Sequence, residues 1–330
     1  AMVKGALARA YQPEIGLYHT YFYYQVTRWK AMETAPSQPE TGELRVWPEE
    51  FEQGTLPEFL EGQVAALRVE RDCRKRRELY GAVRKSQLYD RQLGMYKICA
   101  DLSTAPEEIG RIKVFPRGWL ENESIFLHME YKYLLELLRS GLNEEFFAEL
   151  PRLMVCYQQP EVYGRNPLEN SSFIVSSAYP EAKLHGSGFV ARLSGSNAEL
   201  VHIWLYMSFG PAPFLVTNEG DLELEFKPVL NKSFFSTSEV KVKVLRRNGE
   251  IKEYHLPACS YTANFLGNTL VVYHNPNRKA TFGSESATIK EMNLTTFNGE
   301  KKFISGAKLS GDWARKVREG AIERIDVLMV

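Results

Sequence analysis

The stretch Gly118-Trp-Leu-Glu-Asn-Glu-Ser-Ile-Phe-Leu-His128 leads directly into the strongest helical pattern of this chain. Apolar residues recur at helical spacing over 124–141 and Gly141 provides a stop, so we expect an amphipathic helix there. The stretch also gathers a carboxylate, an amide and an imidazole. His128 follows Glu121 by seven positions, nearly two helical turns, so both side chains can face the same way. We therefore expect a site for a polar ligand, although His128 could also pack internally and the glutamates could serve the helix dipole.

A second segment, 192–199, reads Arg-Leu-Ser-Gly-Ser-Asn-Ala-Glu and precedes an apolar helix expected over 198–209. The start of a helix leaves backbone N–H groups unpaired and carries about half a positive charge, which suits an anion. Ser194 adds a hydroxyl donor, and Gly195 lets the backbone come close. The alternative is an ordinary helix cap, because serine and glycine are favoured there in any case.

Composition limits the class of protein. The chain has 330 residues, enough for two domains, and its 41 basic residues balance 41 acidic ones. That balance favours neither nucleic acid nor an anionic membrane, and we expect neither as a partner. The four cysteines are far apart, as in a reduced cytoplasmic protein without a zinc site, and no segment resembles a membrane span or signal peptide. The start at Ala1-Met2-Val3 is typical of a cloning remnant or of one piece of a longer protein.

The period of the apolar pattern changes near Gly210-Pro-Ala-Pro213. Before it we expect extended structure over 16–26, a proline-rich surface loop over 35–57, helices from residue 63, an antiparallel helical partner over 143–157 and a long polar loop over 158–193. After it, alternating strands surround two Asn-Gly turns, at 248–249 and 298–299. We expect a helical domain over 1–214 and a β-sandwich, of the jelly-roll kind, over 215–330.

The motifs resemble those of family 94-type inverting glycoside phosphorylases, such as cellobiose and chitobiose phosphorylase. Those enzymes carry Glu-Asn-Gly-Gly-x-Phe/Tyr-x-His, and this chain has Glu-Asn-Glu-Ser-Ile-Phe-Leu-His over 121–128 with the same spacing. They also carry a later Gly-x-Gly followed by Thr-Gly-Ser/Thr-Ala, which is similar to 186–198 here. Residues 168–177, together with 186–195, resemble most the long-chain branch that includes 1,2-β-oligoglucan phosphorylase, and the general resemblance extends to the C-terminal stretch 265–276. The resemblance covers most of the chain.

The resemblance implies a function. Residues 1–214 would be the C-terminal part of an (α/α)6 barrel, the catalytic domain of an enzyme that cleaves β-glucosidic bonds of oligo-glucans with inorganic phosphate, releasing a sugar 1-phosphate. No cofactor or metal is implied, since phosphate is the co-substrate. His128, Ser194 and Gly195 would hold the phosphate, and Glu121 would bind the acceptor sugar. We also expect substrate contacts from Trp119, Asn122, Arg165 and Glu169.

Several residues depart from the family pattern. Leu120 stands where a lysine is common, Glu123 and Ser124 replace Gly-Gly, and Glu199 replaces glycine, which leaves the acceptor sugar and the linkage open. The general acid of the family, an aspartate well upstream, has no counterpart here. We therefore expect no catalytic residue in this chain, no activity from it alone, and an N-terminal portion of the same enzyme as a partner, with a homodimer also possible. The alternatives are a non-catalytic carbohydrate-binding protein and a glycoside hydrolase or transglycosylase relative.

Overall fold

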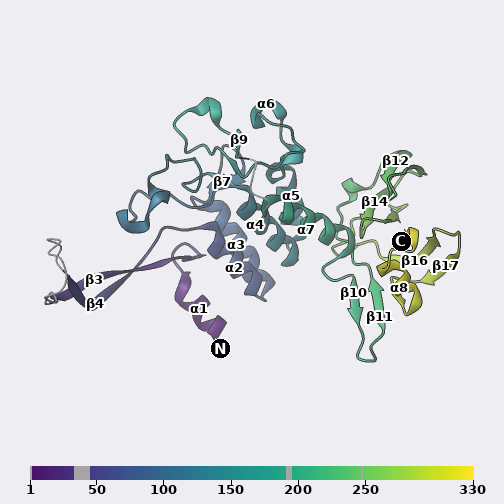
Figure 1. Ribbon diagram of the computed structural model, residues 1–330, viewed down its shortest axis with the longest axis horizontal. Coiled ribbons are helices and arrows are strands. Elements are labelled where there is room, and N and C mark those ends of the chain that lie inside the picture. The colour runs from purple at the N-terminus through teal and green to yellow at the C-terminus, as the bar shows by residue number, and fades with distance from the viewer. Residues whose placement is uncertain (1, 33–44, 191–194, 247) are drawn as a thin grey trace, which may run out of the picture. The chain divides into compact units, whose positions relative to one another are not determined.

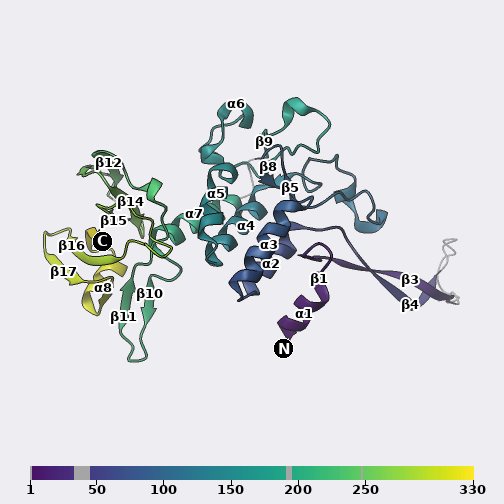
Figure 2. The ribbon, with the colours of Figure 1, turned by 180° about the vertical axis from the view of Figure 1, so that it is seen from behind.

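The chain contains both helices and strands, which confirms the mixed α and β class (Figures 1 and 2). The structure is a computed structural model and describes residues 2–32, 45–190, 195–246 and 248–330. The chain consists of two compact units, residues 1–200 and residues 201–330. In the described ranges, no helix combines the length and the apolar character needed to cross a membrane.

Helices form the core of the first unit, and α4 (Leu127–Arg139) is its centre. Its Leu127, Tyr131, Leu134 and Leu135 are all buried, as the apolar periodicity predicts. Gly141 adopts the left-handed backbone (φ 74°) that ends the helix. The expected start at 124 was too early, because Ile125 and Phe126 form strand β7. Helices α2 (Leu60–Val69) and α5 (Asn143–Leu153) pack on α4. The other helices of the first unit are α1 (Met2–Ala10), α3 (Cys73–Lys85) and α6 (Pro160–Tyr163).

The expected loop over 35–57 is wrong for its second half. Residues Val46–Thr55 form strand β4, which pairs antiparallel with β3 (Phe22–Ala31). Each strand provides the hydrogen-bonding partner that the other needs, and Pro48 is tolerated because β4 is an edge strand. The extended structure expected over 16–26 is present in β2 (Leu17–Tyr18) and in the first half of β3. The remaining strands of the unit are β1 (Tyr11–Gln12), β5 (Tyr89–Asp90), β6 (Met95–Tyr96), β7 (Ile125–Phe126), β8 (Phe173–Ile174) and β9 (Gly188–Phe189).

Strands dominate the second unit. A five-stranded sheet has the order β14-β15-β19-β16-β17, with β15 and β19 parallel and its other neighbours antiparallel, and β10-β11-β18 and β12-β13 form two smaller sheets. Both Asn-Gly turns lie where the pattern predicts, between β12 and β13 and between β16 and β17. The elements are β10 (Phe214–Val216), β11 (Leu222–Glu225), β12 (Val240–Leu245), β13 (Ile251–Leu256), β14 (Ser260–Phe265), β15 (Thr269–His274), β16 (Ile289–Thr296), β17 (Lys301–Ser305), β18 (Lys308–Ser310), α8 (Asp312–Arg318) and β19 (Ile322–Met329).

The boundary between the units falls inside helix α7 (Gly195–Phe209), earlier than the expected 214/215. The last turns of α7 belong to the second unit because they are bonded and packed within it. Val229 N donates to Met207 O at 2.7 Å, and the Phe209 ring lies 4.5 Å from that of Phe265. The apolar pattern of 198–209 is helical along its whole length, so the sequence does not indicate that the boundary between the two units lies inside this helix.

Candidate functional site

Residues 118–124 form a tight loop that leads through the short strand β7 into α4. Gly118 N donates to Asn122 O at 2.8 Å and Asn122 N donates to Trp119 O at 3.1 Å. Gly118 has φ 78°, and a Cβ there would come within 2.7 Å of the Tyr179 Cβ, so glycine is required on two counts. The loop therefore presents its backbone in one fixed conformation.

Glu123 is the main departure from the Gly-Gly pattern, and the structure shows its surroundings. The residue has φ 57°, a left-handed conformation that favours glycine. Its carboxylate is fully buried and accepts from Lys97 Nζ at 2.7 Å and from Arg117 Nε. Two cations offset the cost of burying the charge, so Glu123 is a structural residue that fixes the loop.

Asn122 and Glu121 face different environments. Asn122 is buried, and its Nδ2 donates to Phe115 O at 2.7 Å, so its side chain holds the loop together. Its Oδ1 has no hydrogen-bond partner in the described part of the chain. Glu121 is partly exposed and lies 3.5 Å from Arg111 Nη2. Glu121 is therefore open to a ligand, whereas Asn122 is enclosed.

The three motif segments meet in the small antiparallel sheet β7-β8-β9. A row of aromatic rings begins at Trp119, passes through the side chains of this sheet and ends at the start of α4. Trp119 stacks on Phe189 with ring centroids 3.8 Å apart and planes 5° from parallel. Phe173 and Phe126 continue the row, at 5.5 Å and then 4.7 Å. The row ends at His128, whose ring meets Phe126 edge-on. Trp119 and His128 therefore lie at opposite ends of one aromatic row.

His128 lies in the first turn of α4 and rests on the first residue of α7. A Cβ on Gly195 would come within 2.6 Å of the His128 Cε1, so only glycine admits the ring here. Ser194, the third expected phosphate ligand, lies outside the described residues. Ser196 is buried, and its Oγ has no hydrogen-bond partner in the ranges described. Two of the three expected phosphate ligands thus lie against each other at the start of a fifteen-residue helix.

Glu199 also faces this histidine, which sequence reasoning did not predict. Its Oε1 is 3.7 Å from His128 Nε2. Burial lowers the pKa of His128 below its ordinary value and Lys132 lowers it further, while Glu199 acts in the opposite direction. The imidazole is therefore mainly neutral at pH 7 and can donate one N–H. The Glu199 carboxylate would compete with a bound anion for the position beside the ring.

Arg165 and Glu169 form an ion pair, with Arg165 Nη2 2.9 Å from Glu169 Oε1. Both residues lie in the loop after α6, which is a different segment of the chain from the loop of residues 118–124. This second loop is anchored to α7 through Asn170, which donates from Nδ2 to Asn197 Oδ1 at 2.6 Å and accepts from Tyr131 OH at 3.0 Å. Asn170 is thus a positioning residue that no motif predicted. In the part of the chain that the structure describes, no cluster of three or more His, Cys, Asp or Glu residues is placed to hold a metal ion.

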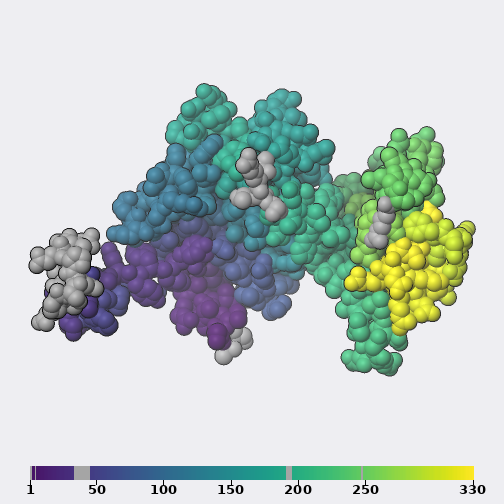
Figure 3. Space-filling view, in the orientation of Figure 1, coloured from purple at the N-terminus to yellow at the C-terminus, as the bar shows by residue number. Residues whose placement is uncertain are grey.

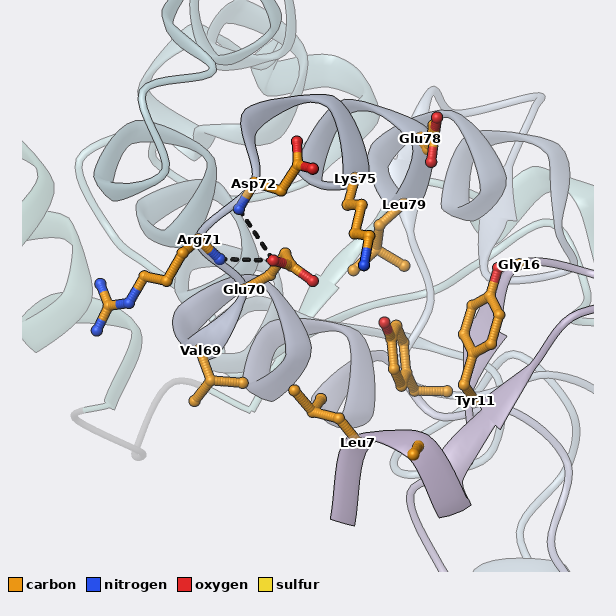
Figure 4. Close-up of a pocket in the computed structure, with 12 residues that line it drawn as sticks. Leu7, Tyr11, Gly16, Val69, Glu70, Arg71, Asp72, Lys75, Glu78 and Leu79 are labelled. Atoms are coloured by element: carbon orange, nitrogen blue, oxygen red, sulfur yellow. Dashed lines mark hydrogen bonds between the residues drawn. The ribbon is translucent and has the colours of Figure 1, made fainter. Parts of the chain in front are cut away.

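A separate cavity of about 740 Å³ lies among α1, the turn between β1 and β2, and the facing ends of α2 and α3 (Figure 4). The Tyr11 and Tyr18 rings lie 5.1 Å apart, and Lys75 and the Glu70 carboxylate are turned toward the same space. Hydrogen bonds from Asp72 N and Arg71 N hold the pKa of Glu70 below its ordinary value, so the carboxylate is charged. None of the expected site residues lines this cavity.

Comparison with known proteins gives no match to a family model and no match to a curated sequence. The geometry of the site is therefore the main support for a functional interpretation.

Proposed function

We propose that this chain is the C-terminal part of an inverting glycoside phosphorylase of the family 94 type, acting on β-linked oligo-glucans in the cytoplasm. In this proposal the first unit is part of an (α/α)6 barrel and the second is a β-sandwich. The chain supplies the phosphate and acceptor-sugar sites. The observation that carries the proposal is the fit of the His128 ring against the Gly195 backbone at the start of α7.

Phosphorolysis of a glycosidic bond requires a bound phosphate and a proton donor for the leaving oxygen. An oxygen of phosphate forms the bond to the anomeric carbon while the glycosidic C–O bond breaks, and a carboxylic acid protonates the leaving oxygen. The first-turn N–H groups of α7 and the neutral imidazole would hold the phosphate by donated hydrogen bonds. The acid is assigned to a portion of the enzyme outside this chain. Without it, the rate falls by roughly 10² to 10⁴, so the chain alone should release no sugar 1-phosphate at a rate near that of the complete enzyme.

The aromatic row supports the sugar part of the proposal. Pyranose rings pack on aromatic faces, and Trp119 is partly exposed at the end of the row beside Glu121. Glu121 can accept hydrogen bonds from sugar hydroxyls. The chain lengths and the linkage preferred depend on surfaces beyond these two residues.

Titration calorimetry with inorganic phosphate tests the proposal. His128→Ala should weaken phosphate binding at least about tenfold, about 1.4 kcal/mol, and leave binding of β-linked gluco-oligosaccharides unchanged. His255→Ala is the matched control, since that side chain is 70 % exposed on β13. Equal losses for phosphate and sugar, or no phosphate binding by the unmodified chain, would remove the basis of the proposal.

A carbohydrate-binding protein without catalytic function is the second candidate, and the cavity in Figure 4 favours it. Two tyrosine rings, a charged carboxylate and an ammonium group around an apolar floor suit a neutral sugar. Under this alternative, Tyr11→Ala would abolish oligosaccharide binding and His128→Ala would change nothing. Under the phosphorylase proposal, the sugar site is at Trp119 and Tyr11→Ala leaves it intact.

A further inference from the structure

The cavity of about 740 Å³ beside α1 is lined by none of the residues that the phosphorylase proposal assigns to phosphate or to sugar. Its volume is within the range of small-molecule sites, about 300 to 1,000 Å³. Tyr11 on its wall is 45 % exposed, and α1, drawn in purple, forms part of the outer surface of the first unit (Figure 3). A small molecule can therefore reach the cavity from solvent, and the lining determines which kind fits.

One wall of the cavity is aromatic and apolar. The rings of Tyr11 and Tyr18 lie 5.1 Å apart with their planes tilted by 50°. Leu7, Val69 and Leu79 line the cavity as well. An aromatic group of a ligand gains most from such a wall, because it can stack on the tyrosine rings or meet them edge-on. The wall therefore suits a ligand with an aromatic body.

Several charged side chains around the cavity already have partners or point away from it. Asp72 caps α3 by accepting a hydrogen bond from Arg74 N at 2.8 Å, and Glu78 Oε1 lies 3.9 Å from Arg74 Nε. The guanidinium of Arg71 is turned away from the cavity (Figure 4). These groups are therefore not the ones that a ligand in the cavity would meet first.

Glu70 and Lys75 face the cavity with opposite charges (Figure 4). Among the described residues, Glu70 accepts hydrogen bonds only at Oε1, from Arg71 N at 2.7 Å and Asp72 N at 2.9 Å, which leaves Oε2 for a ligand. The bond from Asp72 N lowers the pKa of Glu70 most, and the charge of Lys75 lowers it further. Lys75 Nζ nevertheless forms no ion pair within the part of the chain that the structure describes. A carboxylate oxygen and an ammonium group are thus both available to a ligand.

This pair of charges selects among classes of ligand. A neutral sugar, which the second candidate function places here, would remove water from both charges without supplying a counter-charge. An anion such as phosphate would be repelled by Glu70, and a simple amine would be repelled by Lys75. A zwitterion can pair with both groups through charge-assisted hydrogen bonds. The charges therefore favour a zwitterion over each of the other classes.

We propose that this cavity binds a free aromatic amino acid. The ammonium group of the ligand donates to Glu70 Oε2, and its carboxylate accepts from Lys75 Nζ. Its ring packs on Tyr11 and Tyr18. The inference does not depend on the proposed function, because His128 does not line the cavity and the two sites are tested with different ligands.

Titration calorimetry with L-tryptophan tests the proposal, and two analogues each remove one charge from the ligand. Tryptamine lacks the carboxylate, and N-acetyl-L-tryptophan lacks the ammonium group. The unmodified chain should bind L-tryptophan with a Kd below about 1 mM and each analogue at least about tenfold more weakly. Cellobiose, a neutral sugar, should not compete. The analogues test both charges on the unmodified chain, so the result does not depend on whether a variant folds.

Two variants assign each charge of the ligand to its partner. Glu70→Gln keeps the acceptor for both backbone N–H groups, and it should weaken L-tryptophan binding at least about tenfold without weakening that of N-acetyl-L-tryptophan. Lys75→Gln should weaken L-tryptophan binding to a similar extent without weakening that of tryptamine. Lys85→Gln is the matched control, because Lys85 is an exposed lysine on the same helix outside the cavity. Circular dichroism verifies that each variant is folded.

Four results would overturn the proposal. They are no binding of L-tryptophan up to about 10 mM, equal affinity for either analogue, unchanged L-tryptophan binding in both cavity variants, and competition by cellobiose. The last result would assign the cavity to sugar. Phosphate titration should give the same affinity in the unmodified chain and in both cavity variants, so a failure here is distinct from a failure of the phosphorylase proposal.

Discussion

The imidazole of His128 lies directly against the backbone of Gly195, so that a Cβ on Gly195 would overlap the ring. These residues are far apart in sequence, one in the first turn of α4 and the other at the start of α7. Their contact places a ring nitrogen beside the N–H groups that open a helix, an arrangement that suits an anion.

Gly195→Ala should displace the His128 ring and weaken phosphate binding at least about tenfold, about 1.4 kcal/mol. Helicity of α7 should persist, since alanine favours helices more than glycine does. Gly81→Ala in α3 is the matched control, because nothing lies within 4 Å of a Cβ there. Phosphate titration of both variants gives the comparison. Unchanged affinity in Gly195→Ala would show that the ring and the helix start do not share a ligand.

The contact could be anticipated only in part from the sequence. The apolar period fixes α4, and the Asn-Gly pairs fix two hairpins, because these signals are local. That His128 and Gly195 could share a ligand followed from resemblance to known motifs. The presence of Glu199 beside them did not, since it depends on how α4 and α7 pack.

Two further differences between the sequence-based predictions and the structure also arise from long-range packing. Strand β4 has a polar and proline-containing sequence, and it is a strand because β3 offers it a partner. Asn122 belongs to a ligand-like motif, yet the loop encloses it and uses its amide to bind Phe115 O. Long-range packing decides both outcomes, and no window of sequence contains that information.

Glu199→Gln should tighten phosphate binding. The carboxylate lies 3.7 Å from His128 Nε2, and two like charges about 4 Å apart repel by roughly 1 to 4 kcal/mol near a protein surface. Losing Glu199 also lowers the pKa of His128 further, because that carboxylate acts to raise it. At pH 7.5, above the ordinary pKa of histidine, the imidazole is mainly neutral in both proteins, so the difference in phosphate affinity there reports mainly the repulsion. We expect about a tenfold gain in phosphate affinity, about 1.4 kcal/mol.

Titration at pH 7.5 of Glu199→Gln and of Glu161→Gln, an exposed glutamate on α6, tests this expectation. The control should match the unmodified chain. Weaker binding in Glu199→Gln would mean that the carboxylate orients the imidazole for its ligand, and the repulsion argument would then fail.

Glu130→Gln should stabilise the first unit at neutral pH. Glu130 is fully buried in α4, where its Oε1 accepts from Tyr96 N at 2.8 Å and its Oε2 has no hydrogen-bond partner among the described residues. Burial raises the pKa of Glu130 well above its ordinary value, and the nearby Glu149 and Asp90 raise it further. The folded state therefore keeps the proton, while the unfolded chain releases it above the ordinary pKa.

The sign of the pH dependence follows from these protonation states. Below the ordinary pKa of glutamic acid, Glu130 is protonated in both the folded and the unfolded state, so its ionisation does not change the free energy of unfolding. As pH rises toward the folded pKa, the unfolded state gains about 1.4 kcal/mol per pH unit. Glutamine keeps the acceptor for Tyr96 N and never ionises, so Glu130→Gln should unfold at higher urea concentration than the unmodified chain at pH 7.5 and lose this advantage near pH 4. Urea unfolding of both proteins across this range is the measurement. A variant that is less stable at pH 7.5 would show that the ionised carboxylate stabilises the fold.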